Sequence, residues 1–157
     1  MVRARRPAGE QVERPLRLLL VGHFDTVFES DSPFQRFEID ENEPQRATGP
    51  GVADMKGGLV VMLEALRGLR AIGELDGADW TVLLNSDEEI GSLGSRALIE
   101  GEARRAEFGF VFESAHHGAM IHSRRGLGQF HLVVKGVAAH AGSAHEHGRS
   151  AIHEMAA

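Results

Sequence analysis

The stretch Asn85-Ser86-Asp87-Glu88-Glu89-Ile90-Gly91-Ser92 is the part of the sequence around which the rest of the chain is organised. It follows the apolar run Val82-Leu83-Leu84, which is typical of the end of a buried strand. Adjacent glutamates at the mouth of such a strand repel each other and raise each other's affinity for protons. A bound metal ion together with a general base would account for the pair. The alternative is a solvated acidic start of the next helix, which the helix dipole favours.

Composition limits the classes of protein to which the chain can belong. With 157 residues it is long enough for one domain of ordinary size, and its formal net charge of −6 argues against a nucleic-acid surface. The absence of cysteine excludes disulfides, thiolate zinc sites and a cysteine nucleophile, so a metal site must use His, Asp and Glu. No apolar run approaches about 18 residues, and the run at 16–21 is too short for a signal peptide. We therefore expect no membrane partner and a cytoplasmic location.

The hydrophobic pattern alternates between strand and helix, which predicts an α/β fold. Residues 1–15 are charged and read as a flexible leader. Beyond a boundary near 126, residues 127–134 alternate as a half-exposed strand would, a histidine-rich loop follows, and 149–157 begin a helix, so residues 127–157 read as the start of a second domain. In the first domain, 16–126, we expect core strands at 16–21, 80–84 and 108–112, helices at 55–72 and 92–104, and a short strand pair at 37–39 and 46–48.

Polar side chains with metal-binding or acid–base chemistry follow all three core strands. Because the carboxyl ends of strands in an open α/β sheet meet at the ligand site, these residues should converge. His, Asp and Glu together suit Zn²⁺, with Co²⁺ or Mn²⁺ as substitutes. Taken singly, each has a plainer interpretation, such as a hydrogen-bonded loop, a helix N-cap or an exposed surface residue. Their common placement favours a metal site made from His23, Asp25, Asp54, Glu88, Glu89 and Glu113.

Five motifs together resemble one enzyme family. They are Gly22-His23-Phe24-Asp25-Thr26-Val27, the stretch from Gly49 to Gly58, the stretch from Asn85 to Ser92, Phe112-Glu113, and the stretch from Gly136 to Gly142. The set resembles the co-catalytic zinc peptidases and deacylases, which include glutamate carboxypeptidases of the carboxypeptidase G type, aminoacylase, acetylornithine deacetylase and succinyl-diaminopimelate desuccinylase. The carboxypeptidase G branch is the most similar, because a glutamate follows the third strand.

The resemblance implies a three-layer catalytic domain with a mixed, largely parallel sheet and helices on both faces. It also implies that residues 127–157 begin an α+β lid and dimerisation domain, so that both domains are incomplete here and a homodimer forms through the lid. Two Zn²⁺ ions would occupy the active site of the complete enzyme. In this implied site His23 and Glu113 bind the first metal ion, Asp54 bridges both, and Glu89 binds the second.

The resemblance also assigns the catalytic residues. Glu88 would be the general base, Asp25 would orient His23 through a hydrogen bond, and His140 would support the oxyanion from a neighbouring subunit. The implied reaction is hydrolysis of an amide, in a peptide or an N-acyl amino acid, next to a free carboxylate, by metal-activated water. The alternative is a truncated or degenerate relative that binds metal or dimerises without catalysis.

Departures from the family pattern bear on this alternative. The family places a histidine ligand of the second metal ion much later in a longer chain, and nothing in the motifs aligns His116, His117 or His122 with it. We therefore expect the 157-residue chain alone to be inactive or incomplete. Ser114 stands where a proline is common, a departure to which the sequence attaches no metal role.

Overall fold

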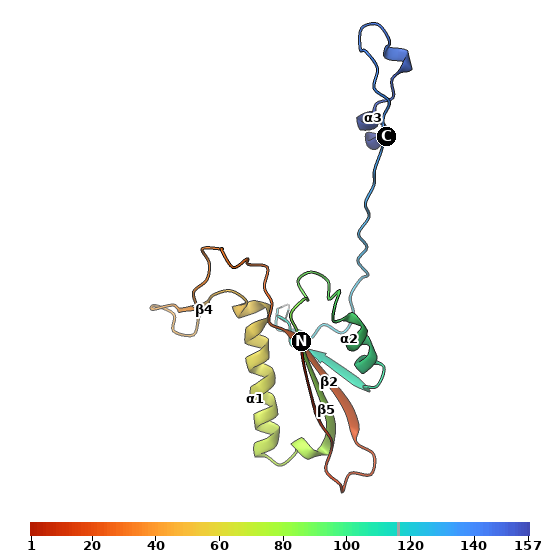
Figure 1. Cartoon of the computed structure of the whole chain (residues 1–157). Coiled ribbons are helices and arrows are strands. Elements are labelled where there is room, and N and C mark those ends of the chain that lie inside the picture. Colours follow the sequence, from red (N-terminus) through yellow and green to blue (C-terminus); the bar gives the residue numbers. More distant parts are fainter. Residues whose placement is uncertain (116) are drawn as a thin grey trace. The chain divides into compact units, whose positions relative to one another are not determined.

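The apolar run at the start of the first predicted domain forms an inner strand of a four-stranded sheet, the middle one of its three parallel strands (Figure 1). The computed structural model describes residues 1–115 and 117–157. Strand β2 (Leu16–His23) pairs in parallel with β5 (Ala78–Asn85) on one side and with β6 (Phe108–Val111) on the other. Strand β1 (Val2–Arg6) adds to the outer edge of β5 in the antiparallel sense, which gives the order β1-β5-β2-β6.

Helices cover both faces of this sheet, so the predicted α/β fold is confirmed. Helix α1 (Gly57–Ala71) lies against one face, where a Cβ atom at Gly22 would come within 2.5 Å of Leu59. Helix α2 (Arg96–Ala103) lies on the other face, because its Glu102 bonds to Arg3 and Arg5, whose side chains project from the side of the sheet opposite to Gly22. The buried apolar side chains between the layers are Leu19, Leu20, Met55, Met62, Ala78 and Leu83.

Short elements connect the core strands and helices. Strands β3 (Glu38–Ile39) and β4 (Ala47–Thr48) form the expected antiparallel pair. A short helical segment, η1 (Val52–Lys56), precedes α1 and is interrupted by non-helical backbone angles at Asp54 and Met55. A single 3₁₀ turn, η2 (Leu75–Gly77), leads into β5. The predicted helix at 92–104 forms over a shorter range, since α2 begins at Arg96.

The amino-terminal residues correct the prediction of a flexible leader over 1–15. Residues 2–6 form β1, and the chain beyond it is tied to the sheet by two hydrogen bonds, from Ala8 N to Asp79 Oδ1 (2.7 Å) and from Gly9 N to Asp76 O (2.8 Å). The run of arginines suggests a solvated arm in the sequence. In the structure, alternate arginines of β1 point to one side, where a buried carboxylate from a distant part of the chain neutralises them.

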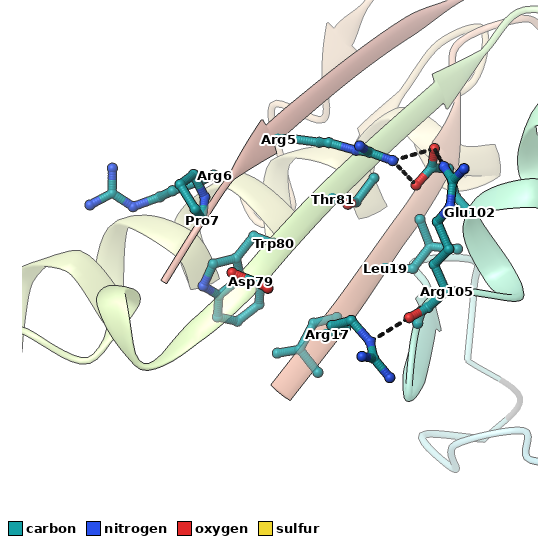
Figure 2. A pocket seen from close by; sticks show the side chains of 12 residues that line it. Arg5, Arg6, Pro7, Arg17, Leu19, Asp79, Trp80, Thr81, Glu102 and Arg105 are labelled. Carbon is teal, nitrogen blue, oxygen red and sulfur yellow. Dashed lines mark hydrogen bonds and ion pairs between the residues drawn. The ribbon is translucent and has the colours of Figure 1, made fainter. Parts of the chain in front are cut away.

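That carboxylate, Glu102, is the centre of an ion-pair cluster (Figure 2). Its side chain is only 3% exposed, and it accepts hydrogen bonds from Arg3 (3.1 Å), Arg5 (2.6 Å) and Arg105 (3.1 Å). The hydrogen bond from Arg5 is the main reason that the pKa of Glu102 is lowered. A cavity of about 320 Å³ lies beside the cluster, at the amino ends of β2 and β5 and therefore away from the strand ends that carry the candidate ligands.

The second compact unit, residues 121–157, follows the first unit, residues 1–120. It contains a 3₁₀ turn, η3 (His145–His147), helix α3 (Ala151–Ala156) and an isolated bridge between Val137 and Arg149. The prediction of a strand at 127–134 is wrong, because this segment has no pairing partner in the described parts of the chain and Phe130 is 97% exposed. Its role as the start of a lid domain stays a prediction. None of the described helices is long and apolar enough to cross a membrane.

We predict that Glu102→Gln lowers the free energy of unfolding at pH 7 by about 1–3 kcal/mol, because it removes charge-assisted hydrogen bonds that tie β1 to α2. Since the folded pKa of Glu102 lies below its ordinary value of 4.5, this stabilisation is complete above that value and is lost as the pH falls through the folded pKa. Urea denaturation at several pH values measures the difference.

The matched control is Glu100→Gln on the same helix, where an exposed pair with Arg104 at 3.5 Å should contribute less than about 1 kcal/mol. If the Glu102 and Glu100 variants lost equal stability at pH 7, the cluster would not hold the amino-terminal strand.

Candidate metal centre

The carboxyl ends of the three parallel strands bring the predicted residues to one edge of the sheet. His23 is the last residue of β2 and is paired in register with Asn85, the last residue of β5. Glu113 follows the end of β6 by two residues, and Glu88 follows the end of β5 by three. Because β2 is central, its last side chain lies between the segments that leave its two neighbours. Sheet topology alone therefore converges these groups, as expected at the carboxyl edge of an open α/β sheet.

The turn before α1 supplies a fourth group, Asp54. Gly51 adopts a left-handed conformation (φ 72°), which a glycine accommodates without strain, and the Lys56 N–H donates to the Gly51 carbonyl at 2.7 Å. The chain then passes through η1, and the Asp54–Met55 peptide bond is cis. Met55 is fully buried, and its sulfur accepts a hydrogen bond from the His23 N–H at 3.1 Å. The residue next to Asp54 is thereby fixed against the end of β2.

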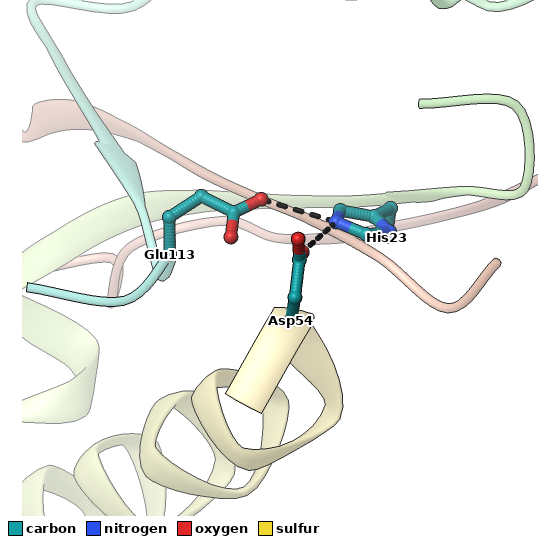
Figure 3. A group of neighbouring side chains, drawn as sticks. All are labelled: His23, Asp54 and Glu113. Atoms are coloured by element: carbon teal, nitrogen blue, oxygen red, sulfur yellow. Dashed lines mark hydrogen bonds and ion pairs between the residues drawn. The ribbon is translucent and has the colours of Figure 1, made fainter. Parts of the chain in front are cut away.

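Three of the predicted ligands form one cluster, which Figure 3 shows. The Nε2 atom of His23 lies 3.0 Å from Asp54 Oδ1 and 3.1 Å from Glu113 Oε1. One ligand atom from each of these residues lies within 4.8 Å of the other two. The His23 ring is 1% exposed, whereas the carboxylates of Asp54 and Glu113 are 62% and 29% exposed. The cluster therefore has a rigid buried imidazole on one side and an opening toward solvent on the other.

The charges around His23 favour a cation at this place. Burial by itself lowers the pKa of the imidazole. The negative charges of Glu113, Glu88 and Asp25, and the hydrogen bond that Asp54 accepts from the ring, outweigh burial, so that the pKa of His23 is raised. A proton on His23 partly neutralises the carboxylates when no other cation is present. A divalent metal ion would replace that proton and carry a larger charge.

The pKa values of two carboxyl groups near His23 also indicate an excess of negative charge. Burial raises the pKa of Glu113, and the nearby charge of Asp54 raises it further. The pKa of Glu89 is raised for the same two reasons, in the same order. In both cases the attraction of His23 is too weak to reverse the shift. The group thus holds more negative charge than its own residues compensate.

The second ring nitrogen of His23 faces Asp25. Nδ1 lies 3.2 Å from the main-chain oxygen of Asp25, to which it is hydrogen-bonded, and 3.3 Å from the carboxylate atom Oδ1. Oδ1 is buried and accepts no hydrogen bond from the described residues, whereas Oδ2 accepts one from the Glu89 N–H at 3.0 Å. The main chain of Asp25 therefore holds a proton on Nδ1, which leaves the Nε2 lone pair of the neutral ring directed at the cluster.

The two glutamates of the opening stretch occupy different positions. Glu88 Oε2 lies 3.9 Å from His23 Nε2, and its side chain is half exposed, so it sits beside the cluster with access to solvent. Glu89 does not contribute an atom to the three-residue group, although its main-chain N–H binds Asp25. Because Glu88 and Glu89 are neighbours in a segment that is not helical, their carboxylates can face different partners.

Sequence reasoning missed the residues that shape this loop. Asp87 accepts hydrogen bonds from Gly94 N (2.7 Å) and Ser95 N (3.0 Å), and the hydrogen bond from the Ser95 side chain is the main cause of its lowered pKa. The buried Asn85 donates to Ser92 Oγ and Ser95 Oγ. Short polar side chains often form hydrogen bonds with nearby backbone groups. The Asn, Asp and Ser residues that follow β5 are therefore the sequence signal that could have indicated a hydrogen-bonded loop here.

His140 lies in the second unit, in the turn that follows Ala139. Its Nδ1 atom accepts hydrogen bonds from the N–H groups of Gly142 and Ser143, both at 3.2 Å. The neutral ring then carries its proton on Nε2, which makes that atom a hydrogen-bond donor. Of the other histidines considered as ligands, His116 lies outside the described residues, and neither His117 nor His122 belongs to the three-residue cluster.

Comparison with known proteins gives a consistent result. The family model described as peptidase family M20/M25/M40 matches residues 19–140. Carboxypeptidase G2 of Pseudomonas sp. (strain RS-16) is 40% identical over 143 residues, which cover 87% of this chain and 33% of that protein. Succinyl-diaminopimelate desuccinylase 2 of Shewanella loihica is 34% identical, covering 82% of this chain and 37% of that protein.

Acetylornithine deacetylase of Salmonella arizonae is also 34% identical, over 71% of this chain and 31% of that protein. The chain thus spans about a third of the length of these curated relatives. The matched range contains His23, Asp54 and Glu113 as well as both glutamates of the opening stretch. On this evidence the chain belongs to peptidase family M20/M25/M40.

Proposed function

We propose that this protein is a zinc-dependent hydrolase that cleaves an amide, in a peptide or an N-acyl amino acid, next to a free carboxylate. The observation that carries the proposal is the cluster of His23, Asp54 and Glu113, with the carboxylate of Glu88 beside it. The relatives are named as a carboxypeptidase, a desuccinylase and a deacetylase, names that all describe removal of a group joined through an amide.

The donor set fits a zinc ion. One imidazole nitrogen and carboxylate oxygens are borderline-to-hard ligands of the kind that Zn²⁺ accepts, and Co²⁺ and Mn²⁺ are possible substitutes. Ligand atoms bound tetrahedrally at about 2.0 Å lie about 3.3 Å from each other. The distances of 3.0 and 3.1 Å from His23 Nε2 to the two carboxylates are close to that separation. His23, Asp54 and Glu113 would hold the first metal ion, and Glu89 a second ion bridged by Asp54.

A bound metal ion would supply Lewis acidity, which polarises the scissile carbonyl and lowers the pKa of water. Glu88 is the proposed general base: its carboxylate takes a proton from the attacking water and gives it to the leaving nitrogen as the carbon–nitrogen bond breaks. Glu88 is half exposed, so water from the solvent can reach its carboxylate, which lies 3.9 Å from the Nε2 atom of His23. Asp25 keeps His23 in the orientation that the ligand role requires.

His140 is proposed to stabilise the negative charge that develops on the carbonyl oxygen. The protonated Nε2 of its neutral ring is free to donate such a bond, because Nδ1 is already occupied by two main-chain N–H groups. In this proposal His140 acts in the active site of a second subunit, in a homodimer formed through the domain that begins at 127. The substrate is a small peptide or N-acyl amino acid, and neither nucleic acid nor membrane takes part.

A second candidate function is metal binding or dimerisation without catalysis. One observation favours it: among the described residues, Glu89 stays outside the cluster and only one histidine enters it. A site for one metal ion is therefore assembled, while the second ion has fewer ligands. In the first candidate function Glu88 transfers a proton during hydrolysis, and in the second it does not. The rate of amide hydrolysis by the Glu88→Gln variant, described below, distinguishes the two.

We predict that the chain binds about one Zn²⁺ tightly and that its affinity falls as the pH decreases from 8 to 6. His23 and Glu113 must lose their protons to bind metal, and the pKa values of both are raised, so protons compete at higher pH than they would for free histidine, at 6.5. Below the pKa of His23 the affinity should fall about tenfold per pH unit. Calorimetric titration in the presence of a competing chelator measures it.

His23→Gln serves as the control, because this variant loses both the tight binding and its dependence on pH. Two tightly bound ions per chain would contradict the expectation that the second ion has too few ligands for tight binding. An affinity that does not change between pH 8 and 6 would contradict the assignment of His23 and Glu113 as ligands.

We predict that Glu88→Gln leaves zinc affinity within about threefold and lowers the rate of amide hydrolysis by a factor of about 100 or more, because an amide cannot accept the proton of the attacking water. Hydrolysis of N-acyl amino acids and dipeptides is measured on this chain and on any longer polypeptide that contains it. Glu100→Gln on α2 should behave as the unaltered protein. Near-normal turnover by the Glu88 variant would exclude it as the base.

A further inference from the structure

Two contacts join the chain segments that carry the cluster's carboxylates. The hydroxyl of Ser114, the residue after Glu113, donates a hydrogen bond to the main-chain oxygen of Ala53, the residue before Asp54, at 2.8 Å. These residues are 61 positions apart in the sequence, so this bond is not a local turn interaction. It links the segment that leaves β6 directly to the segment that enters α1, one residue away from each candidate ligand.

The second contact depends on the absence of a side chain at Gly58. A Cβ atom at this position would lie 1.8 Å from the main-chain oxygen of Phe112 and 3.3 Å from its Cβ atom. The first turn of α1 thus packs directly on the backbone of the residue before Glu113. Any larger residue would have to displace backbone rather than the end of a flexible side chain.

These contacts oppose a force that separates the two segments. The carboxylates of Asp54 and Glu113 repel each other, and both belong to segments outside the regular strands and helices of the sheet core. Asp54 is 62% exposed, so its own side chain is little restrained by packing. The distance between the two carboxylates is therefore set by how their backbones are joined, rather than by burial of the side chains themselves.

We propose that Ser114 and Gly58 are positioning residues that hold the segments of Asp54 and Glu113 at the separation required for metal binding. The inference rests on the proposed function, because it assumes that the cluster binds a divalent ion. Ser114 acts by tethering the two segments, and Gly58 acts by allowing them to approach. Neither residue contacts the ion. Each acts through the ligand that follows its contact partner in the sequence, which is Asp54 for Ser114 and Glu113 for Gly58.

The first test compares Ser114→Ala with Ser114→Thr. Zn²⁺ affinity is measured by competition with a chromophoric chelator, and the visible absorption of the Co²⁺-loaded protein reports ligand geometry. We expect Ser114→Ala to weaken Zn²⁺ binding about three- to tenfold, the factor that corresponds to one net hydrogen bond, and to alter the Co²⁺ spectrum. Ser114→Thr keeps the hydroxyl and should remain within about twofold of the unaltered protein. Equal affinities and spectra for the alanine variant and the unaltered protein would overturn the role of Ser114.

The second test uses a matched pair of glycines on one helix. Gly58→Ala should weaken Zn²⁺ binding by more than about tenfold, a loss of the size seen when groups that support metal ligands are disturbed. Gly68→Ala, at a position of α1 where the added methyl group meets no described atom within 4 Å apart from the neighbouring backbone of its own helix, should leave the affinity unchanged. If the two variants bound Zn²⁺ equally well, the close approach at Gly58 would have no bearing on the site.

The outcomes separate this inference from the proposed function. If the unaltered chain bound neither Zn²⁺ nor Co²⁺, both the proposed function and the inference would fall. If the unaltered chain bound them and the Ser114 and Gly58 variants bound them equally, only the inference would fall. Should Gly58→Ala not fold, as judged by circular dichroism of the metal-free protein, the comparison of Ser114→Ala with Ser114→Thr decides on its own.

Discussion

The repulsion among carboxylates around the buried ring of His23 is the constraint on which the site depends. Burial and mutual repulsion raise the pKa of Glu113, while the same carboxylates raise the pKa of His23. Such a group is stable only if the fold holds the charges together against their repulsion and a cation compensates them. The parallel strands meet the first need, because their carboxyl ends lie at one edge of the sheet. A metal ion, which the relatives' family generally requires, would meet the second.

The supporting structure of the site is built from contacts that are distant in sequence. Met55 anchors the turn of Asp54 to the end of β2, Asp25 ties the glutamate loop to the same strand, and Ser114 ties the segment after β6 to the start of α1. Each contact joins two of the segments that leave the sheet. The cluster is therefore a property of the whole edge, and its geometry can change when a residue that touches no ligand is replaced.

The sequence predicts the parts of the fold that depend on local pattern. The central strand at 16–21, the helix before Ile72 and the strand before Glu88 follow from apolar runs and helical periodicity, and the positions of His23, Glu88 and Glu113 follow from strand ends. The clustering of His23, Asp54 and Glu113 was also expected, because parallel strands share an edge.

Local pattern could not predict β1, since its arginines find their partner, Glu102, almost a hundred residues away. The strand expected at 127–134 fails for the opposite reason: its alternation is present, but no strand among the residues that the structure describes pairs with it. The sequence marks Ser114 only as a departure from a common proline and Gly58 only as part of a motif. It does not predict the contacts of either residue, which are made with segments distant in the sequence.

We propose that the carboxyl edge of the sheet binds a divalent metal ion through one imidazole and two carboxylates. Crystals of the protein grown with Zn²⁺ and measured at the zinc absorption edge test this claim most directly. We expect an anomalous peak about 2.0–2.2 Å from His23 Nε2 and from one oxygen each of Asp54 and Glu113. An anomalous peak held by other residues, with the His23 cluster still free of metal at saturating Zn²⁺, would contradict it.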